Sequence, residues 1–108
     1  MPSDRTEFPR IDSNFAPRRG EDVHTVVLDG EAVLLDEREN RLHLLNHTAT
    51  LLWQLYDGEA SLAELASDVS AELGVDHDTV LADLLTITRH LGAEGLLVGV
   101  VADWERGE

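Results

Sequence analysis

Hydrophobic and polar residues alternate between Arg41 and Leu44, and beyond this stretch they switch to the spacing of a helix. The alternation has the two-residue period of a strand with one polar and one apolar face. Asn46, between the two patterns, is a residue type that caps the start of a helix, and Asp57-Gly58 is suited to end it. The apolar face of the helix contains Ala49, Leu52, Trp53 and Tyr56, and is widened by Leu51 and Leu55. We therefore predict a strand that leads directly into a helix, with the apolar faces of both in one core.

Two further strands are predicted upstream of this junction. Residues 24–29 (HTVVLD) are rich in β-branched residues and end at Asp29-Gly30, a dipeptide that is a strong signal for a two-residue hairpin turn. Residues 31–36 (EAVLLD) form the return strand, and a polar loop over 36–40 leads to the third strand over 41–45. Strands joined by such short turns are antiparallel neighbours, because parallel neighbours need a long crossover. The third strand continues into a helix, so we expect it at an edge of the sheet with unpaired backbone groups.

Two more helices follow the first. Ser61 and Glu64 fit the capping box of a helix that Gly74 is suited to end. Asp76 is the expected N-cap of the last helix, which carries two apolar stripes where one is enough to face the core. The first stripe comprises Val80, Leu84, Ile87 and Leu91, and the second comprises Leu81, Leu85 and Thr88. The second stripe either packs against another element, which is the more common arrangement, or lines a groove.

The order of the elements predicts an α+β domain with a winged helix-turn-helix arrangement: an N-terminal three-stranded antiparallel sheet followed by three helices. The apolar run over 96–101 (LLVGVV) can add a short wing strand. We expect a flexible N-terminal arm over 1–22, which contains all three prolines, a domain over 23–101 and a polar tail over 102–108. No apolar run is long enough to span a membrane, and the N-terminus lacks the apolar segment of a secretory signal, so the cytoplasm is the expected compartment.

The chain is strongly acidic, with a net charge of -14 from 22 acidic and 8 basic residues. A field of this sign repels phosphate backbones, which nucleic-acid-binding proteins neutralise with Lys and Arg. The last helix would be the DNA-reading helix of a winged helix, but its first turns carry Asp76, Asp78 and Asp83. A winged-helix DNA-binding transcriptional regulator is therefore an alternative that the fold suggests and the charge opposes.

Few residues are placed for catalysis. The absence of Cys excludes disulfides, thiolate metal sites and cysteine nucleophiles, and the absence of Lys excludes a Schiff-base lysine. The five histidines form no metal-binding pattern, and the chain has neither a nucleophile-elbow serine nor a glycine-rich phosphate loop. We therefore expect no enzymatic activity, no cofactor and no metal site.

Peptide recognition is the function that this combination favours. An edge strand beside a helix with surplus apolar surface can accept an extended peptide as an added strand. Main-chain hydrogen bonds then set the register, and pockets select the side chains. An alternative function for the same edge strand is that of a structural dimerisation module, in which this strand pairs with another copy of the chain.

Several segments of the chain resemble PqqD-like proteins, the recognition elements for precursors of ribosomally synthesised and post-translationally modified peptides (RiPPs). The segments are LDGEAVLLD, RLHLLNHTATLLWQLYDG, SLAELASDV, VLADLL and GLL, over about residues 23–98. The most specific part is Leu45-Asn46-x-Thr48-Ala49, followed by Trp53 and Asp57-Gly58. Many relatives have proline after the asparagine, where this chain has His47. That difference changes the first helical residue and is not expected to affect the groove.

The resemblance implies a non-catalytic protein, without a cofactor, that binds the leader of a precursor peptide. The leader would pair antiparallel with the third strand, in a groove between that strand and the third helix. The domain would present the precursor to a modifying enzyme such as a radical-SAM protein, a cyclodehydratase or a leader peptidase. Similar stand-alone proteins serve pyrroloquinoline quinone and lasso-peptide pathways, and the sequence does not choose between them.

For the partners, we expect no nucleic acid, no membrane, and a monomer or weak homodimer. Carried over by position, the leader-binding residues are Arg41, Leu42, His43, Leu44, Val80, Asp83, Leu84, Ile87 and His90. The motif leaves open which of these line the groove and which fill the core.

Overall fold

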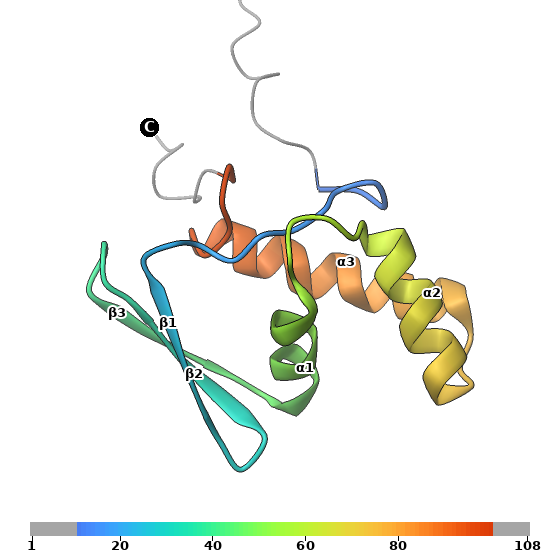
Figure 1. Ribbon diagram of the computed structural model, residues 1–108, viewed down its shortest axis with the longest axis horizontal. Coiled ribbons are helices and arrows are strands. Elements are labelled where there is room, and N and C mark those ends of the chain that lie inside the picture. The colour runs from blue at the N-terminus through green and yellow to red at the C-terminus, as the bar shows by residue number, and fades with distance from the viewer. Residues whose placement is uncertain (1–10, 101–108) are drawn as a thin grey trace, which may run out of the picture.

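Three strands of the chain form one antiparallel sheet in the order β1-β2-β3 (Figure 1). The computed structural model describes residues 11–100, and the strands are β1 (Val23–Leu28), β2 (Glu31–Asp36) and β3 (Arg41–Leu45). Asp29 and Gly30, which join β1 to β2, both have positive φ angles, of 55° and 81°, as a tight hairpin turn requires. The predicted antiparallel meander is confirmed.

Three helices follow the sheet: α1 (His47–Leu55), α2 (Leu62–Leu73) and α3 (His77–Ala93). The side chain of Asn46 accepts a hydrogen bond from the backbone N–H of Ala49 at 2.9 Å and so caps α1. Ser61 and Glu64 form the reciprocal capping box of α2, and Gly74 ends that helix in the left-handed conformation. These local predictions are confirmed, and the arrangement is an α+β fold consistent with a winged helix-turn-helix.

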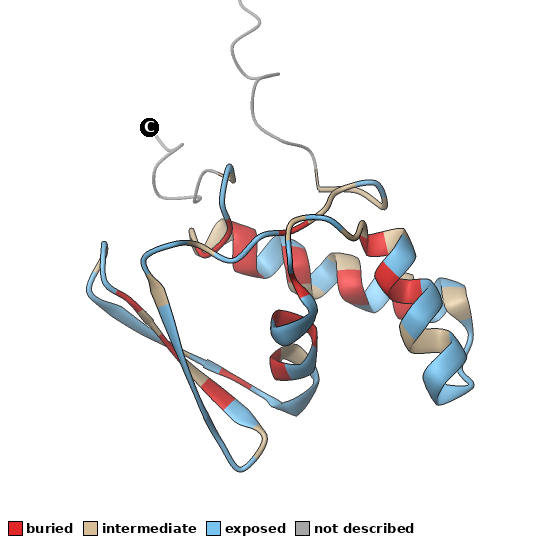
Figure 2. Ribbon diagram, viewed as in Figure 1, coloured by how far each residue is buried: buried red, intermediate tan, exposed pale blue. Residues whose placement is uncertain are grey.

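The core lies between the sheet and the helices, where the buried residues of Figure 2 gather. Trp53 of α1 and Tyr56, which caps the end of that helix, are buried and contact each other edge to face, with ring centroids 5.9 Å apart. The Nε1–H of Trp53 donates to Thr25 Oγ1 at 2.9 Å, and the Tyr56 hydroxyl lies 2.6 Å from Thr88 Oγ1. Burial raises the pKa of Tyr56 to about 12. The hydrogen bond with Thr88 lowers this pKa, but its effect is smaller than that of burial.

One side of α1 differs from its prediction. Leu51 and Leu55, expected to widen the apolar face, are 50% and 43% exposed. Thr50 is buried instead, and its hydroxyl accepts from the Ala32 N–H at 2.8 Å and donates to the Leu45 carbonyl at 3.3 Å. A polar residue is stable in this position because both polar backbone groups lie within reach of it. The hydroxyl thereby ties α1 to β2 and to β3.

Residues 11–22, part of the predicted arm, run along the domain and are hydrogen-bonded to it. The Pro17 carbonyl accepts from the Gly58 N–H at 2.8 Å, which joins this segment to the link between α1 and α2. The Gly20 N–H donates to the Leu96 carbonyl at 2.8 Å, which joins it to the chain after α3. Residues 1–10 of the arm and the predicted tail over 102–108 lie outside the described residues.

The wing strand expected over 96–101 does not form over 96–100. Pairing there is reduced to a single antiparallel bridge between Arg19 and Leu97. Gly95 and Gly99 both have positive φ angles, and these left-handed residues interrupt an extended run on either side of the bridge. Among the helices of residues 11–100, none has the length and apolar character needed to cross a membrane.

Candidate functional site

β3 is an edge strand that borders a groove. Within residues 11–100 it pairs with β2 alone, so no other strand of that range lies along its outer edge. A hollow of about 620 Å3 lies between β3 and α3. The strand contributes residues 42–45 to its lining, and the helix contributes Thr86, Ile87, His90 and Leu91.

The floor of this groove is apolar. Leu45, Leu91 and Leu96 line it and are only 7%, 2% and 0% exposed, so the floor is continuous with the core of the domain. Ile87 is half-buried and stands above this floor on α3. An apolar side chain that enters the groove would therefore leave water for hydrocarbon, a transfer worth about 1.5–3 kcal/mol for a large aliphatic residue.

A polar cluster around Glu94 marks one end of the groove. Glu94 Oε1 lies 3.6 Å from Arg41 Nη2 and 4.0 Å from His43 Nδ1. The His43 side chain is 12% exposed, and its Nε2 atom is buried with no hydrogen-bond partner among the described residues. Glu94 was not predicted from the sequence, although it continues the helical spacing of Ile87 and His90 by one more turn.

The structure brings together only part of the predicted site. Leu42, His43, Leu44, Ile87 and His90 border the groove, and Arg41 joins its polar end through Glu94. Val80 and Leu84 are 8% and 6% exposed and belong to the core. Asp83 is exposed and does not line the groove.

The two faces of β3 are the reverse of those expected from its pattern. The apolar positions Leu42 and Leu44 are 68% and 80% exposed, so the expectation that they face the core is wrong. The polar residue His43 lies on the helix side instead. Side chains alternate along a strand, so Leu42 and Leu44 point away from the helices and border the groove mainly through their backbone.

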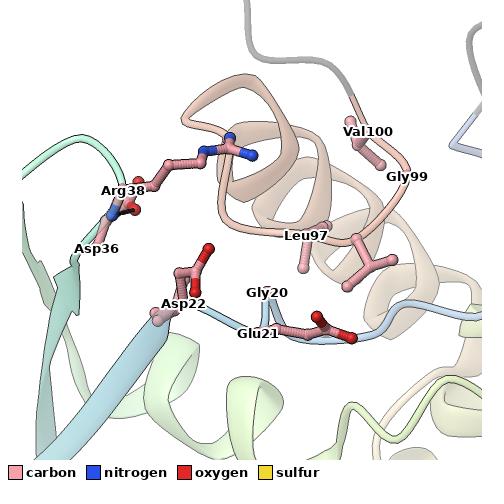
Figure 3. Close-up of a pocket in the computed structure, with 11 residues that line it drawn as sticks. Gly20, Glu21, Asp22, Asp36, Arg38, Leu97, Gly99 and Val100 are labelled. Carbon is pink, nitrogen blue, oxygen red and sulfur yellow. Dashed lines mark hydrogen bonds between the residues drawn. The ribbon is translucent and has the colours of Figure 1, made fainter.

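A second hollow, of about 440 Å3, lies between residues 20–23 and 95–100 (Figure 3). Asp36 is in its wall, with Oδ1 accepting from the backbone N–H groups of Arg38 and Glu39 at 3.1 and 3.4 Å. Glu21 and Asp22 also line this hollow, and Figure 3 shows Asp22 between Asp36 and Glu21. Loops and strand ends form this hollow, so it offers no length of strand edge to an extended peptide.

The sequence matches the model of a known protein family. A family model described as coenzyme PQQ synthesis protein D (PqqD) matches residues 31–97, more than half of the chain. The chain belongs to the PqqD family. The matched range runs from the first residue of β2 to the bridge residue Leu97, and it contains every residue that lines the groove of this PqqD-family chain.

One solved structure is also similar to this chain. The structure of TbiB1 in complex with the TbiA(beta) leader peptide is similar to this chain, with a TM-score of 0.69 and 27% sequence identity. The similarity covers 78% of this chain and 98% of TbiB1. No curated protein matches the chain.

The charged groups of α3 oppose a nucleic-acid role for this PqqD-family member. Asp76 and Asp78 lie at the start of the helix, where a winged helix would approach phosphates. The guanidinium of Arg89 donates to the Ile11 carbonyl at 3.0 and 3.2 Å and is thus engaged within the domain. In the described part of the chain, no group of three or more His, Asp or Glu residues is placed to hold a metal ion.

Proposed function

We propose that this protein is a non-catalytic binding protein for the leader segment of a ribosomally synthesised precursor peptide. The leader lies antiparallel to β3 as a fourth strand, in the groove between β3 and α3. The groove carries this proposal, since an apolar hollow of about 620 Å3 lies beside a strand edge. The fold similarity to TbiB1, whose structure holds a leader peptide, supports it.

Strand addition accounts for both affinity and selectivity. Each main-chain hydrogen bond contributes about 0.5–1.5 kcal/mol net, and each apolar side chain buried on the groove floor contributes about 1.5–3 kcal/mol. About four bonds and two anchors contribute roughly 5–12 kcal/mol before the cost of ordering the peptide, about 2–5 kcal/mol, is subtracted. Micromolar affinity, roughly -8 kcal/mol, lies near the upper end of the difference. Successive leader side chains point to opposite faces, so every second one enters the groove.

Antiparallel pairing also sets where the rest of the precursor leaves the domain. β3 runs from Arg41 to Leu45, so the leader runs from the Leu45 end toward the Arg41 end. The segment to be modified then emerges beside the polar cluster around Glu94. From this position the domain presents the precursor to a modifying enzyme, such as a radical-SAM protein, a cyclodehydratase or a leader peptidase.

Ile87 and Leu44 provide a matched test of the groove, because both border it but only Ile87 stands above its floor. We expect Ile87→Asp to weaken binding of a fluorescently labelled leader at least about tenfold, because the buried site would then hold an unpaired charge. Leu44→Lys should weaken it less than about threefold, because that side chain points to the opposite face of the sheet. Fluorescence anisotropy measures the affinity, and thermal unfolding shows whether each variant is folded. Full affinity for the leader in a folded Ile87→Asp variant would show that the groove is not the leader-binding site.

The two rival functions give different results with the same protein. A DNA-binding regulator would retain duplex DNA at low salt and lose it steeply as the salt concentration rises. A dimerisation module would form a dimer in light scattering that a saturating amount of leader leaves intact. A monomer that binds the leader and leaves DNA unshifted at low salt excludes both.

A further inference from the structure

The sheet has a second apolar face, on the side away from the helices. Side chains alternate along a strand, so the neighbours of the buried residues Ala32 and Leu34 point outward. We call this the outer sheet face, and its apolar residues are Val26, Leu28, Val33, Leu35, Leu42 and Leu44, with His24 and Glu31 on the same face. Val26, Leu28, Leu42 and Leu44 are 55%, 62%, 68% and 80% exposed. Val33 lies opposite both Val26 and Leu44 in the register, so the apolar surface is continuous across all three strands.

A sheet of this kind is expected to be polar on its free face. Antiparallel sheets with one face in water normally alternate apolar residues inward with polar residues outward. Here β3 does the reverse, with His43 inward and Leu42 and Leu44 outward. Figure 2 shows long stretches of β1 and β3 as exposed. Single exposed apolar residues need no explanation, but a contiguous apolar patch indicates an interaction surface.

We propose that the outer sheet face is the docking surface for the modifying enzyme, and that the matching surface of that enzyme is apolar with a border of Arg and Lys. This inference rests on the proposed leader-binding function and adds the place where the enzyme binds. The border of the outer sheet face carries exposed carboxylates, Glu31 at one end and Glu37 at the other. The Oε1 atom of Glu37 also lies 3.1 Å from the Nε2 atom of His24. With a net charge of -14, the whole chain attracts a basic partner surface.

A second copy of the chain fits this face less well than a larger partner does. Strands of six, six and five residues cover about 14 × 20 Å, or roughly 300 Å2, from the spacing of strands and residues in a sheet. Two such faces would bury about 600 Å2, well below the roughly 1,200 Å2 of a stable interface. Two chains that each carry a charge of -14 also repel one another.

The bound leader extends this surface. As a fourth strand beside β3, the leader places every second side chain next to Leu42 and Leu44, on the outer sheet face. An enzyme docked there contacts the domain and the leader together. Leader binding then strengthens enzyme binding, and by thermodynamic reciprocity the enzyme strengthens leader binding by the same factor.

The test uses a double variant, Val26→Thr with Leu35→Thr, and the purified full-length enzyme that modifies the precursor as the probe. Both substitutions lie on β1 and β2, away from the β3 edge, and threonine is well tolerated in strands. Leu73→Gln is the control, because Leu73 is also exposed, at 66%, but lies on α2. We expect the double variant to bind the labelled leader with unchanged affinity and the enzyme at least about tenfold more weakly, while the control binds both normally.

Glu31→Gln with Glu37→Gln should slow association with the enzyme and reduce the salt dependence of the association rate.

The outcomes separate this inference from the function on which it rests. A double variant that binds the leader and the enzyme as well as the unaltered protein would overturn the docking surface and leave leader binding intact. A dimer in light scattering that the double variant abolishes would also overturn it, in favour of a second copy of the chain. Absence of leader binding by the unaltered protein would instead overturn the proposed function, and the docking surface with it.

Discussion

Buried hydroxyl groups connect the elements of this fold at single positions. Thr50 and Thr88 are 2% and 0% exposed, and each meets a polar partner from a different element. An apolar replacement at such a site leaves the partner buried without a hydrogen bond, which costs more than the bond itself contributes. The contribution of each hydroxyl can therefore be measured with isosteric substitutions.

Thr50→Val keeps the shape of the side chain but removes the acceptor of the Ala32 N–H. We expect the free energy of unfolding in urea to fall by about 1–3 kcal/mol, the penalty for a buried polar group without a partner. Thr50→Ser retains the hydroxyl and loses one methyl group, so it should cost about 0.8 kcal/mol. A Thr50→Val variant with the urea midpoint and slope of the unaltered protein would show that the hydroxyl adds nothing.

Tyr56 makes the stability of the domain depend on pH in the alkaline range. The pKa of the buried hydroxyl is about 12, against 10.0 for an ordinary tyrosine, so the folded protein retains its proton at pH values where the unfolded chain loses it. This contribution is fully present below pH 10 and is lost as the pH rises toward 12, which lowers the free energy of unfolding by about 2–3 kcal/mol.

The amino-acid composition allows the titration of Tyr56 to be measured without overlap from other side chains. Tyr56 is the single tyrosine, and the chain contains no Lys and no Cys, so it is the only side chain expected to titrate between about pH 9 and 12. Urea unfolding over this range gives the stability, and the ultraviolet absorbance of tyrosinate gives the pKa directly. Tyr56→Phe should abolish the slope. A slope that persists in the phenylalanine variant would assign the alkaline loss to another group.

Single residues were predictable where the decision is local. Asn46 and Ser61 bond to backbone groups three positions away, so the nearby sequence is enough to identify them as caps. Thr50 and Leu51 are adjacent in α1, and the one that enters the core depends on where β2 and β3 place their backbone groups. That information is absent from the helical pattern, which favoured Leu51 on hydrophobicity alone.

At the scale of an element, the start of α2 depends on two reciprocal hydrogen bonds. Ser61 Oγ accepts from the Glu64 N–H at 3.1 Å, and the Glu64 carboxylate accepts from the Ser61 N–H at 2.8 Å. We expect Ser61→Ala to lower the free energy of unfolding by about 1 kcal/mol, because one N–H of the first turn loses its partner. Ser67→Ala, at an exposed position within the same helix, should leave stability unchanged or raise it by about 0.5 kcal/mol, because alanine has the higher helix propensity. Losses of the same size in both variants, measured in urea, would contradict the capping role.

The order of the three strands and three helices was predictable from the sequence, but the rotation of α3 about its axis was not. Of its two apolar stripes, the one with Leu81 and Leu85 packs half-buried against the core. The groove is bordered instead by Ile87, from the stripe assigned to the core, together with His90. Packing against α2 sets this rotation, and a helical pattern with apolar residues on two sides is compatible with either choice.

Over the whole molecule, a net charge of -14 on 108 residues makes self-repulsion a general cost of folding. Repulsion between exposed charges is screened beyond about 30 Å at 0.01 M salt and beyond about 8 Å at 0.15 M salt. We therefore expect the free energy of unfolding at pH 7 to rise as NaCl is added between these concentrations. Urea unfolding at constant temperature measures the change.

The isoelectric point supplies the control for this salt effect. At the calculated value of about 4.5 the chain carries little net charge, so the same addition of NaCl should change its stability far less than at pH 7. Attractive pairs such as Arg41 with Glu94 act in the opposite direction, because salt weakens them too. A decrease in stability with salt at pH 7 would mean that these pairs outweigh the repulsion, and that the acidic surface is balanced locally. In that case long-range attraction of a basic partner would have to come from the exposed carboxylates around the outer sheet face alone.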